Sequence, residues 1–230
     1  MNKITLNVPD GIEHLSEWQE LWNTLPTNQH YILNKRICGC GATEAYIRSD
    51  KKVILASPRK HLLYNKYSQH LKDNLHLYRF TGNKKKYFES RTTSPTDILA
   101  FNDSLTGYIK SGGNKILTTY DSLRKIMEAL KDSGENLSQW IVVVDEFQAI
   151  FYDCQYKAIT EYEFCQVLQK FPTVVYLSAT PYLESYLDKI EQFKDLLVYE
   201  LLWSEAMTQL PNVEVVKSKK SVSELCSRSE

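Results

Sequence analysis

Two adjacent carboxylates, Asp145 and Glu146, are the residues best suited by type and spacing to do chemistry. They directly follow residues 141–144 (IVVV), a β-branched run typical of a strand buried on both faces. Ligands of parallel α/β sheets bind at the carboxyl ends of the strands, so we expect the pair at the rim of a ligand site. One carboxylate could hold Mg²⁺ together with substrate phosphates while the other orients a water molecule. A solvated acidic turn is the alternative interpretation.

A second candidate is a turn rich in small residues, Gly39-Cys40-Gly41-Ala42-Thr43, which leads into a segment of helical character. Glycines let a backbone wrap closely, and the N–H groups of such a loop and helix start can point at a phosphate. The Thr43 hydroxyl, in the first helical turn, could then reach Mg²⁺.

The cation of this second candidate is displaced. An ordinary phosphate loop has a lysine directly before its Ser or Thr, and this chain has Ala42 there. Lys35, on the other side of the loop, is the expected replacement, with Arg36 as the alternative. Taken alone, the segment is equally a Gly-containing turn that binds no nucleotide.

Hydroxyl and basic residues follow other expected strands. Ser57-Pro58-Arg59-Lys60 ends the strand that begins near Lys51 and could hold a nucleic-acid phosphate by hydroxyl and cation. A solvated, basic helix start is the alternative there. Ser178 and Thr180 follow the apolar run 173–177 and could couple a nucleotide site to neighbouring elements.

The elements that must position these residues alternate between strands and helices. Apolar runs predict strands near residues 53–56, 76–80, 115–119, 141–144 and 173–177, strand-like segments at 196–202 and 213–216, and a helix at 182–193. An apolar segment at 30–38 leads into the small-residue turn, and most other intervening segments have helical character. Before them, residues 12–22 have apolar side chains at helical spacing, which predicts a short helix with Trp18 and Trp22 in the core. We therefore expect an α/β fold with a mainly parallel central sheet and helices on both faces.

Composition bounds the function classes. The 230 residues are 43% hydrophobic and 24% charged, which is typical of a globular domain with a sizeable core. Lys plus Arg equals Asp plus Glu, 28 each, so net charge does not indicate a nucleic-acid partner. Neither a signal pattern nor an apolar run of membrane-span length occurs, so we expect a cytoplasmic protein without a membrane partner. The five scattered cysteines are expected to be free thiols.

Five segments in order carry a resemblance to a known family. GCGAT (39–43), ILASPRK (54–60), ILTTYDSL (116–123), VVVDEFQ (142–148) and LSATP (177–181) together resemble the first RecA-like, ATP-binding domain of superfamily-two DEAD-like helicases. The match covers about residues 30–181. The variant loop and the DEFQ box also look like helicases encoded by phages and mobile elements of gut bacteria. The resemblance implies a single RecA-like P-loop NTPase domain, a helicase or translocase motor that hydrolyses ATP with Mg²⁺ in a bacterial or phage-infected cell.

The resemblance also implies residue roles. Catalysis falls to Glu146, Asp145 and Lys35, with Glu146 as the base or water-orienting group and with Asp145 and Thr43 on Mg²⁺. Nucleotide contacts fall to Gly39, Cys40, Gly41, Ala42, Thr43, Gln148, Ser178 and Thr180. Contacts to single-stranded DNA or RNA fall to Ser57, Pro58, Arg59, Lys60, Thr119 and Tyr120.

Two departures from the family qualify the activity. Ala42 replaces the loop lysine that cradles the phosphates. About 50 residues follow Pro181, whereas a second RecA-like domain needs about 100 or more. We therefore expect a helical extension at 1–29, the ATP-binding domain at 30–205, and a tail or the start of a second domain at 206–230. A second RecA-like domain or a protein partner would complete the motor. The alternative function is a catalytically inactive nucleotide- or nucleic-acid-binding module that regulates or sequesters a partner.

Overall fold

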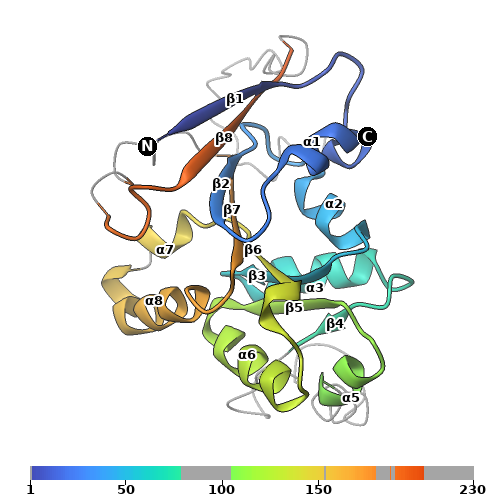
Figure 1. Cartoon of the computed structure of the whole chain (residues 1–230), viewed down its shortest axis with the longest axis vertical. Helices are drawn as coiled ribbons and strands as arrows, with labels where there is room; N and C mark the ends of the chain where they lie inside the picture. The colour runs from blue at the N-terminus through green and yellow to red at the C-terminus, as the bar shows by residue number, and fades with distance from the viewer. Residues whose placement is uncertain (1, 79–104, 153, 180–186, 188–189, 205–230) are drawn as a thin grey trace, which may run out of the picture.

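One parallel sheet forms the centre of the molecule (Figure 1). The computed structural model describes residues 2–78, 105–152, 154–179, 187 and 190–204. Its eight strands are ordered β1-β8-β2-β7-β6-β3-β5-β4, and every pairing is parallel. The strands are β1 Lys3–Asn7, β2 His30–Asn34, β3 Lys52–Ser57, β4 His76–Leu77, β5 Lys115–Thr119, β6 Trp140–Val144, β7 Thr173–Ser178 and β8 Leu197–Leu202. The predicted α/β fold with a parallel sheet is confirmed.

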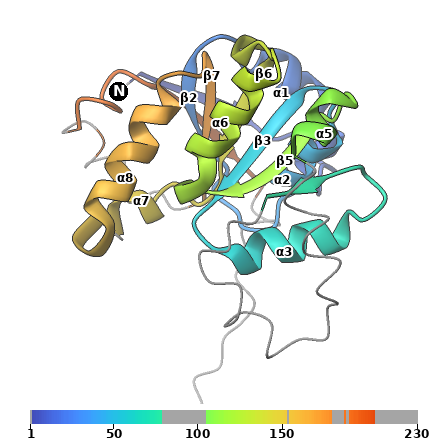
Figure 2. The same cartoon turned by 90° about the horizontal axis from the view of Figure 1, so that it is seen from below.

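Helices cover both faces of this sheet, as the view in Figure 2 shows. The α-helices are α1 Gln19–Thr24, α2 Ala42–Arg48, α3 Lys60–Gln69, α5 Leu105–Lys110, α6 Leu123–Asp132, α7 Ala149–Tyr152 and α8 Cys154–Leu168. Short 3₁₀ turns are η1 Leu15–Glu17, η2 Tyr120–Ser122 and η3 Leu137–Gln139. Because both faces are covered, β5, β6 and β7 are buried along their whole length.

The side-chain alternation of the strands divides the core into two layers. Val142 and Val144 of β6 pack in one cluster with residues of α5, α6 and α8. Val143 points to the other face, where it joins a cluster that contains residues of η1, α1, α2 and α3. The loops after the strands therefore emerge from a sheet that is fixed on both sides.

Several details differ from the sequence-based prediction. Residues 3–7 form β1, an edge strand beside β8 that the apolar pattern did not indicate. The segment at 12–22 divides into η1 and α1, because Trp18 between them has non-helical backbone angles (φ −92°, ψ 82°). The predictions for the helix at 182–193 and the tail at 206–230 lie mostly or wholly outside the described residues.

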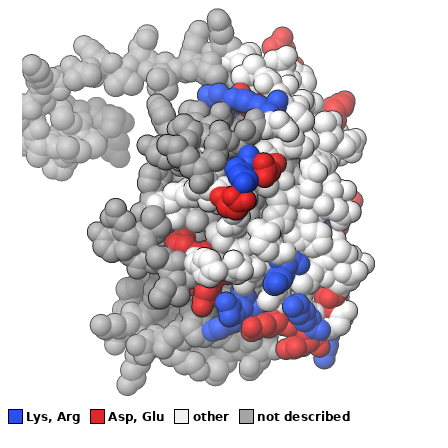
Figure 3. Space-filling model, turned by 60° about the vertical axis from the view of Figure 1, so that its left-hand side comes forward, with Lys and Arg blue, Asp and Glu red and all other residues white. Residues whose placement is uncertain are grey.

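The mixture of charges on the surface and the state of the described cysteines are as the composition indicated. Acidic and basic side chains lie next to one another on the face drawn in Figure 3, without a continuous patch of one sign. Cys38, Cys40 and Cys165 are free thiols, as predicted. Within the described segments, no helix is long and apolar enough to cross a bilayer.

Candidate functional site

Parallel pairing brings the carboxyl ends of the central strands, which several predicted site residues follow, to the same end of the sheet. Lys35 follows β2 and Asp145 follows β6, and β7 lies between these strands. The Lys35 N–H donates to the Ser178 carbonyl at 2.8 Å, and the Asp145 N–H donates to the Ala56 carbonyl at 2.9 Å. The ends of β2, β3, β6 and β7 are thus held in one row by backbone hydrogen bonds.

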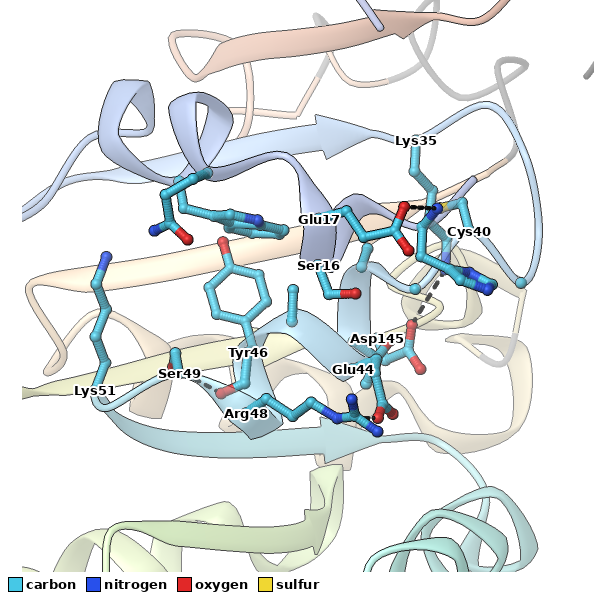
Figure 4. A pocket seen from close by; sticks show the side chains of 18 of the residues that line it. Ser16, Glu17, Lys35, Cys40, Glu44, Tyr46, Arg48, Ser49, Lys51 and Asp145 are labelled. Atoms are coloured by element: carbon cyan, nitrogen blue, oxygen red, sulfur yellow. Dashed lines mark hydrogen bonds and ion pairs between the residues drawn. The ribbon is translucent and has the colours of Figure 1, made fainter. Parts of the chain in front are cut away.

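A cavity of about 1000 Å³ opens at this edge, at the upper end of the size range of ligand pockets. Its wall includes Asp145 of the acidic pair together with Lys35, Gly39, Cys40, Gly41, Ala42 and Thr43, whereas Glu146, Gln148 and Ser178 are not among its lining residues. Figure 4 places Lys35, Cys40 and Asp145 at one end of this cavity and Lys51 at the other.

Lys35 and Asp145 form the charged end of the cavity. Lys35 is 7% exposed, and its Nζ lies 3.8 Å from Asp145 Oδ1. That oxygen is buried and has no hydrogen-bond partner among the described residues. Burial raises the pKa of Asp145 above its ordinary value, and the Lys35 ammonium offsets this only in part. A desolvated carboxylate oxygen without a donor fits coordination to a divalent cation.

The Gly-containing turn has the backbone expected of a close-wrapping loop. Gly39 and Gly41 both adopt left-handed conformations, with φ of +75° and +80°. No described atom lies within 4 Å of the position that a Cβ at Gly39 would take, so this side of the loop is open to a ligand. Gly41 is the N-cap of α2, and the buried Thr43 lies in the first turn. Ala42, at the position of the usual lysine, is 2% exposed.

The N-terminal segment closes over the same loop, which the sequence did not predict. The Leu15 N–H donates to the Cys40 carbonyl at 2.8 Å. A Cβ on Gly41 would lie 3.3 Å from the Cβ of His14. Farther along the cavity, Trp22 packs edge-on against Tyr46 with ring centroids 5.1 Å apart. Apolar spacing indicated that this segment packs on the domain, but it did not indicate where.

A hydrogen-bonded chain joins the acidic turn to β7. Glu146 has a left-handed backbone with φ of +54°. Its Oε2 accepts a hydrogen bond from Gln148 Nε2, and the Ser178 hydroxyl donates to Gln148 Oε1 at 3.2 Å. Glu146, Gln148 and Ser178 are therefore connected by successive hydrogen bonds. Thr180 lies outside the described residues.

The residues predicted to contact nucleic acid fall into two groups. Arg59 and Lys60 are exposed at the start of α3, beside the half-buried Pro58. Ser57, Thr119 and Tyr120 are buried. The Tyr120 hydroxyl donates to the Asp145 carbonyl at 2.6 Å, and its ring stacks on Phe164. Tyr120 thus supports the acidic turn, and Arg59 and Lys60 are the members of the predicted set that are exposed.

Further charged residues line the cavity that the sequence analysis did not single out. They are Glu17, Glu44, Arg48, Asp50, Lys51 and Lys66. Glu44 is tied down by His70, at 2.6 Å, and by Arg48, at 2.7 Å. In the described part of the chain, no group of three or more His, Cys, Asp or Glu side chains could hold a metal ion alone. A Mg²⁺ ion here would need oxygens from a phosphate ligand as well.

We compared the sequence with protein-family models and with curated proteins, and neither comparison gave a match.

Proposed function

We propose that this chain is the ATP-binding motor domain of a nucleic-acid helicase or translocase, which works with Mg²⁺ and with a second RecA-like domain or a protein partner. The observation that carries the proposal is the single cavity that brings Lys35, the loop 39–43 and Asp145 together. These residues come from distant parts of the chain, and they are the cation, backbone amides and carboxylate that a Mg²⁺-nucleotide requires.

The residues present fit such a ligand. The phosphates would lie against the backbone of Gly39 to Thr43, where Gly39 leaves open space, with Lys35 as the cation. Asp145 Oδ1, which lacks a hydrogen-bond donor in the described structure, and the Thr43 hydroxyl would hold Mg²⁺. Glu146 would orient the water that attacks the terminal phosphate. Arg59 and Lys60 would contact the backbone of single-stranded DNA or RNA.

A module that binds nucleotide without turnover is the second candidate. Two observations favour it: Ala42 occupies the position of the loop lysine, and the Glu146 carboxylate is engaged by Gln148. Such a module would still bind Mg²⁺-ATP through Lys35 and Asp145, but it would need a partner to hydrolyse it.

Hydrolysis of ATP by the purified chain tests the proposal. Turnover would be measured with Mg²⁺, with and without single-stranded DNA or RNA, for the unmodified chain and for Glu146→Gln. Glu163→Gln is the matched control, because Glu163 lies on α8 and its side chain is half exposed. We expect turnover that increases with a nucleic acid strand, falls at least about a hundredfold in Glu146→Gln, and is unchanged in the control.

The other outcomes separate the candidates. Binding of Mg²⁺-ATP without turnover under any condition would overturn hydrolysis by the isolated chain and support a module that needs a partner to hydrolyse ATP. Failure to bind ATP would overturn both candidates.

A further inference from the structure

The last strand of the sheet contacts the first residues of the phosphate loop. The indole N–H of Trp203, just after β8, donates to the carbonyl of Lys35 at 2.8 Å. Glu200, within β8, forms an ion pair with the Arg36 guanidinium. Two side chains from one strand end thus hold two consecutive loop residues.

The loop needs such support because its backbone is strained there. Arg36 has φ of +59°, a conformation that costs a non-glycine residue free energy. The Ile37 N–H donates to the Lys35 carbonyl at 2.6 Å, which closes a three-residue γ-turn around Arg36. With a positive φ at its centre this is the rare, strained form of that turn. Strained turns persist only where surrounding contacts over-determine them.

Glu200 is built into the fold rather than placed on the surface. It is 4% exposed, and it pairs with Lys3 of β1 at 2.5 Å as well as with Arg36. A carboxylate so buried is stable only with charged partners. Arg36, whose side chain is about one-third exposed, is therefore drawn toward β8. The side chain of the neighbouring Lys35 reaches toward Asp145, with its Nζ 3.8 Å from Oδ1.

We propose that Glu200 and Trp203 are positioning residues for Lys35: they fix the turn that aims its ammonium at Asp145 and at the phosphates. The proposal rests on the proposed function for the identity of the ligand, but not for the restraint on the loop. Neither side chain lines the cavity, so both would act through Lys35 and Arg36.

Two conservative variants separate the contacts. Glu200→Gln keeps the shape and removes the charge that holds Arg36, and it leaves no buried cation behind because Arg36 and Lys3 are each about one-third exposed. Trp203→Phe keeps an aromatic ring and removes the N–H donor. Lys3→Met is the matched control, since it removes the other cation on Glu200 and leaves the pair with Arg36 intact.

Hydrogen exchange of the backbone amides in residues 35–43, measured without nucleotide, shows directly how firmly the loop is held. We expect faster exchange in Glu200→Gln and Trp203→Phe and no change in Lys3→Met. The Kd for Mg²⁺-ATP then shows how loop restraint affects nucleotide binding. We expect this Kd to rise about tenfold in Glu200→Gln and Trp203→Phe. Thermal unfolding shows whether each variant is folded.

The outcomes distinguish the two proposals. Unchanged exchange in both folded variants would overturn the positioning role, whatever the affinity for ATP. Faster exchange in a chain that binds no ATP would keep the restraint and refute the proposed function. Lower melting temperatures with unchanged exchange and unchanged Kd would mean that Glu200 and Trp203 only stabilise the sheet.

Discussion

Asp145 lies in a buried environment that disfavours its ionised form. Burial raises its pKa in the folded chain above the unfolded value. In the interval between those two values the folded state binds more protons, so stability decreases as pH rises through it. Above that interval the ionised carboxylate remains a net cost to folding. A carboxylate buried against such a cost is typical of a functional site.

Asp145→Asn should therefore stabilise the chain at neutral pH while it abolishes Mg²⁺-dependent binding. The amide resembles the protonated acid, and each kcal/mol gained should raise Tm by about 2–4 °C in a chain of this size. Thermal unfolding at neutral pH and at about pH 4 is the measurement, and the gain should shrink at the lower pH.

Glu135→Gln is the control variant, for which the change in Tm should have the opposite sign. A hydrogen bond from Lys52 Nζ to Glu135 Oε2, at 2.5 Å, lowers the pKa of Glu135. Its stabilisation is present above the unfolded pKa and is lost as pH falls through the lowered one. Glu135→Gln should lower Tm at neutral pH. Equal changes in Tm for Glu135→Gln and Asp145→Asn would contradict the assignment of Asp145 as a destabilising carboxylate.

Lys35 should carry the affinity for phosphates. Lys35→Met keeps the buried stem and removes the ammonium, so we expect a Kd for Mg²⁺-ATP about ten- to a hundredfold higher. Lys51→Met is the matched control, since Lys51 lines the far end of the same cavity and is exposed. Equal losses in a fluorescence titration of both variants would show that the cavity attracts ATP only through its general charge.

Among the elements, the Gly-containing loop 39–43 is shaped by contacts from η1 as well as by its own glycines. Gly41→Ala would place a methyl group 3.3 Å from His14 Cβ, in a left-handed backbone. Gly134→Ala carries the same kind of strain, with φ of +76°, but meets no described atom within 4 Å. Both should lose about 1 kcal/mol in denaturant unfolding.

Only Gly41→Ala should also weaken Mg²⁺-ATP binding, by about tenfold, because only there must the N-terminal segment move away from the loop. If Gly134→Ala lowered the affinity as much, the contact between η1 and the loop would have no part in binding.

The elements show what the sequence could predict. Continuous apolar runs such as Val142 to Val144 indicated the central strands correctly, because burial on both faces removes polar residues from them. β1 was missed because its residues are mostly exposed at the sheet edge and lack that pattern. The close-wrapping turn was expected from Gly39 and Gly41, and both adopt left-handed backbone conformations. The partners of the loop, His14, Glu200 and Trp203, were not, because they are distant in sequence and only the fold brings them close.

At the scale of the molecule, the chain is neutral and its charges are mixed over the face in Figure 3. The proposed binding of nucleic acid would therefore depend on local cations, and Arg59 and Lys60 are exposed candidates at the carboxyl ends of the strands. Ser57, Thr119 and Tyr120 belong to the interior instead. The contacts to nucleic acid expected of Thr119 and Tyr120 came from the family resemblance, and the direction of a side chain at a strand end could not be read from the sequence.

The double variant Arg59→Ala/Lys60→Ala should weaken binding of a single-stranded oligonucleotide and reduce its salt dependence. Each lost phosphate contact lowers the slope of log K against log salt by about 0.7 for single strands. Fluorescence anisotropy at several salt concentrations measures this. Lys131→Ala, an exposed lysine in the last turn of α6, is the control. An unchanged slope in the double variant would place the strand elsewhere.

Calorimetric titration of ATP into the full chain, in Mg²⁺ and again in EDTA, shows whether the chain binds a Mg²⁺-nucleotide at all. We expect saturable binding of one ATP per chain that requires Mg²⁺ and is lost in the combined variant Lys35→Met/Asp145→Asn. Binding that ignores Mg²⁺, binding that survives in that variant, or no binding at about millimolar ATP would contradict this expectation.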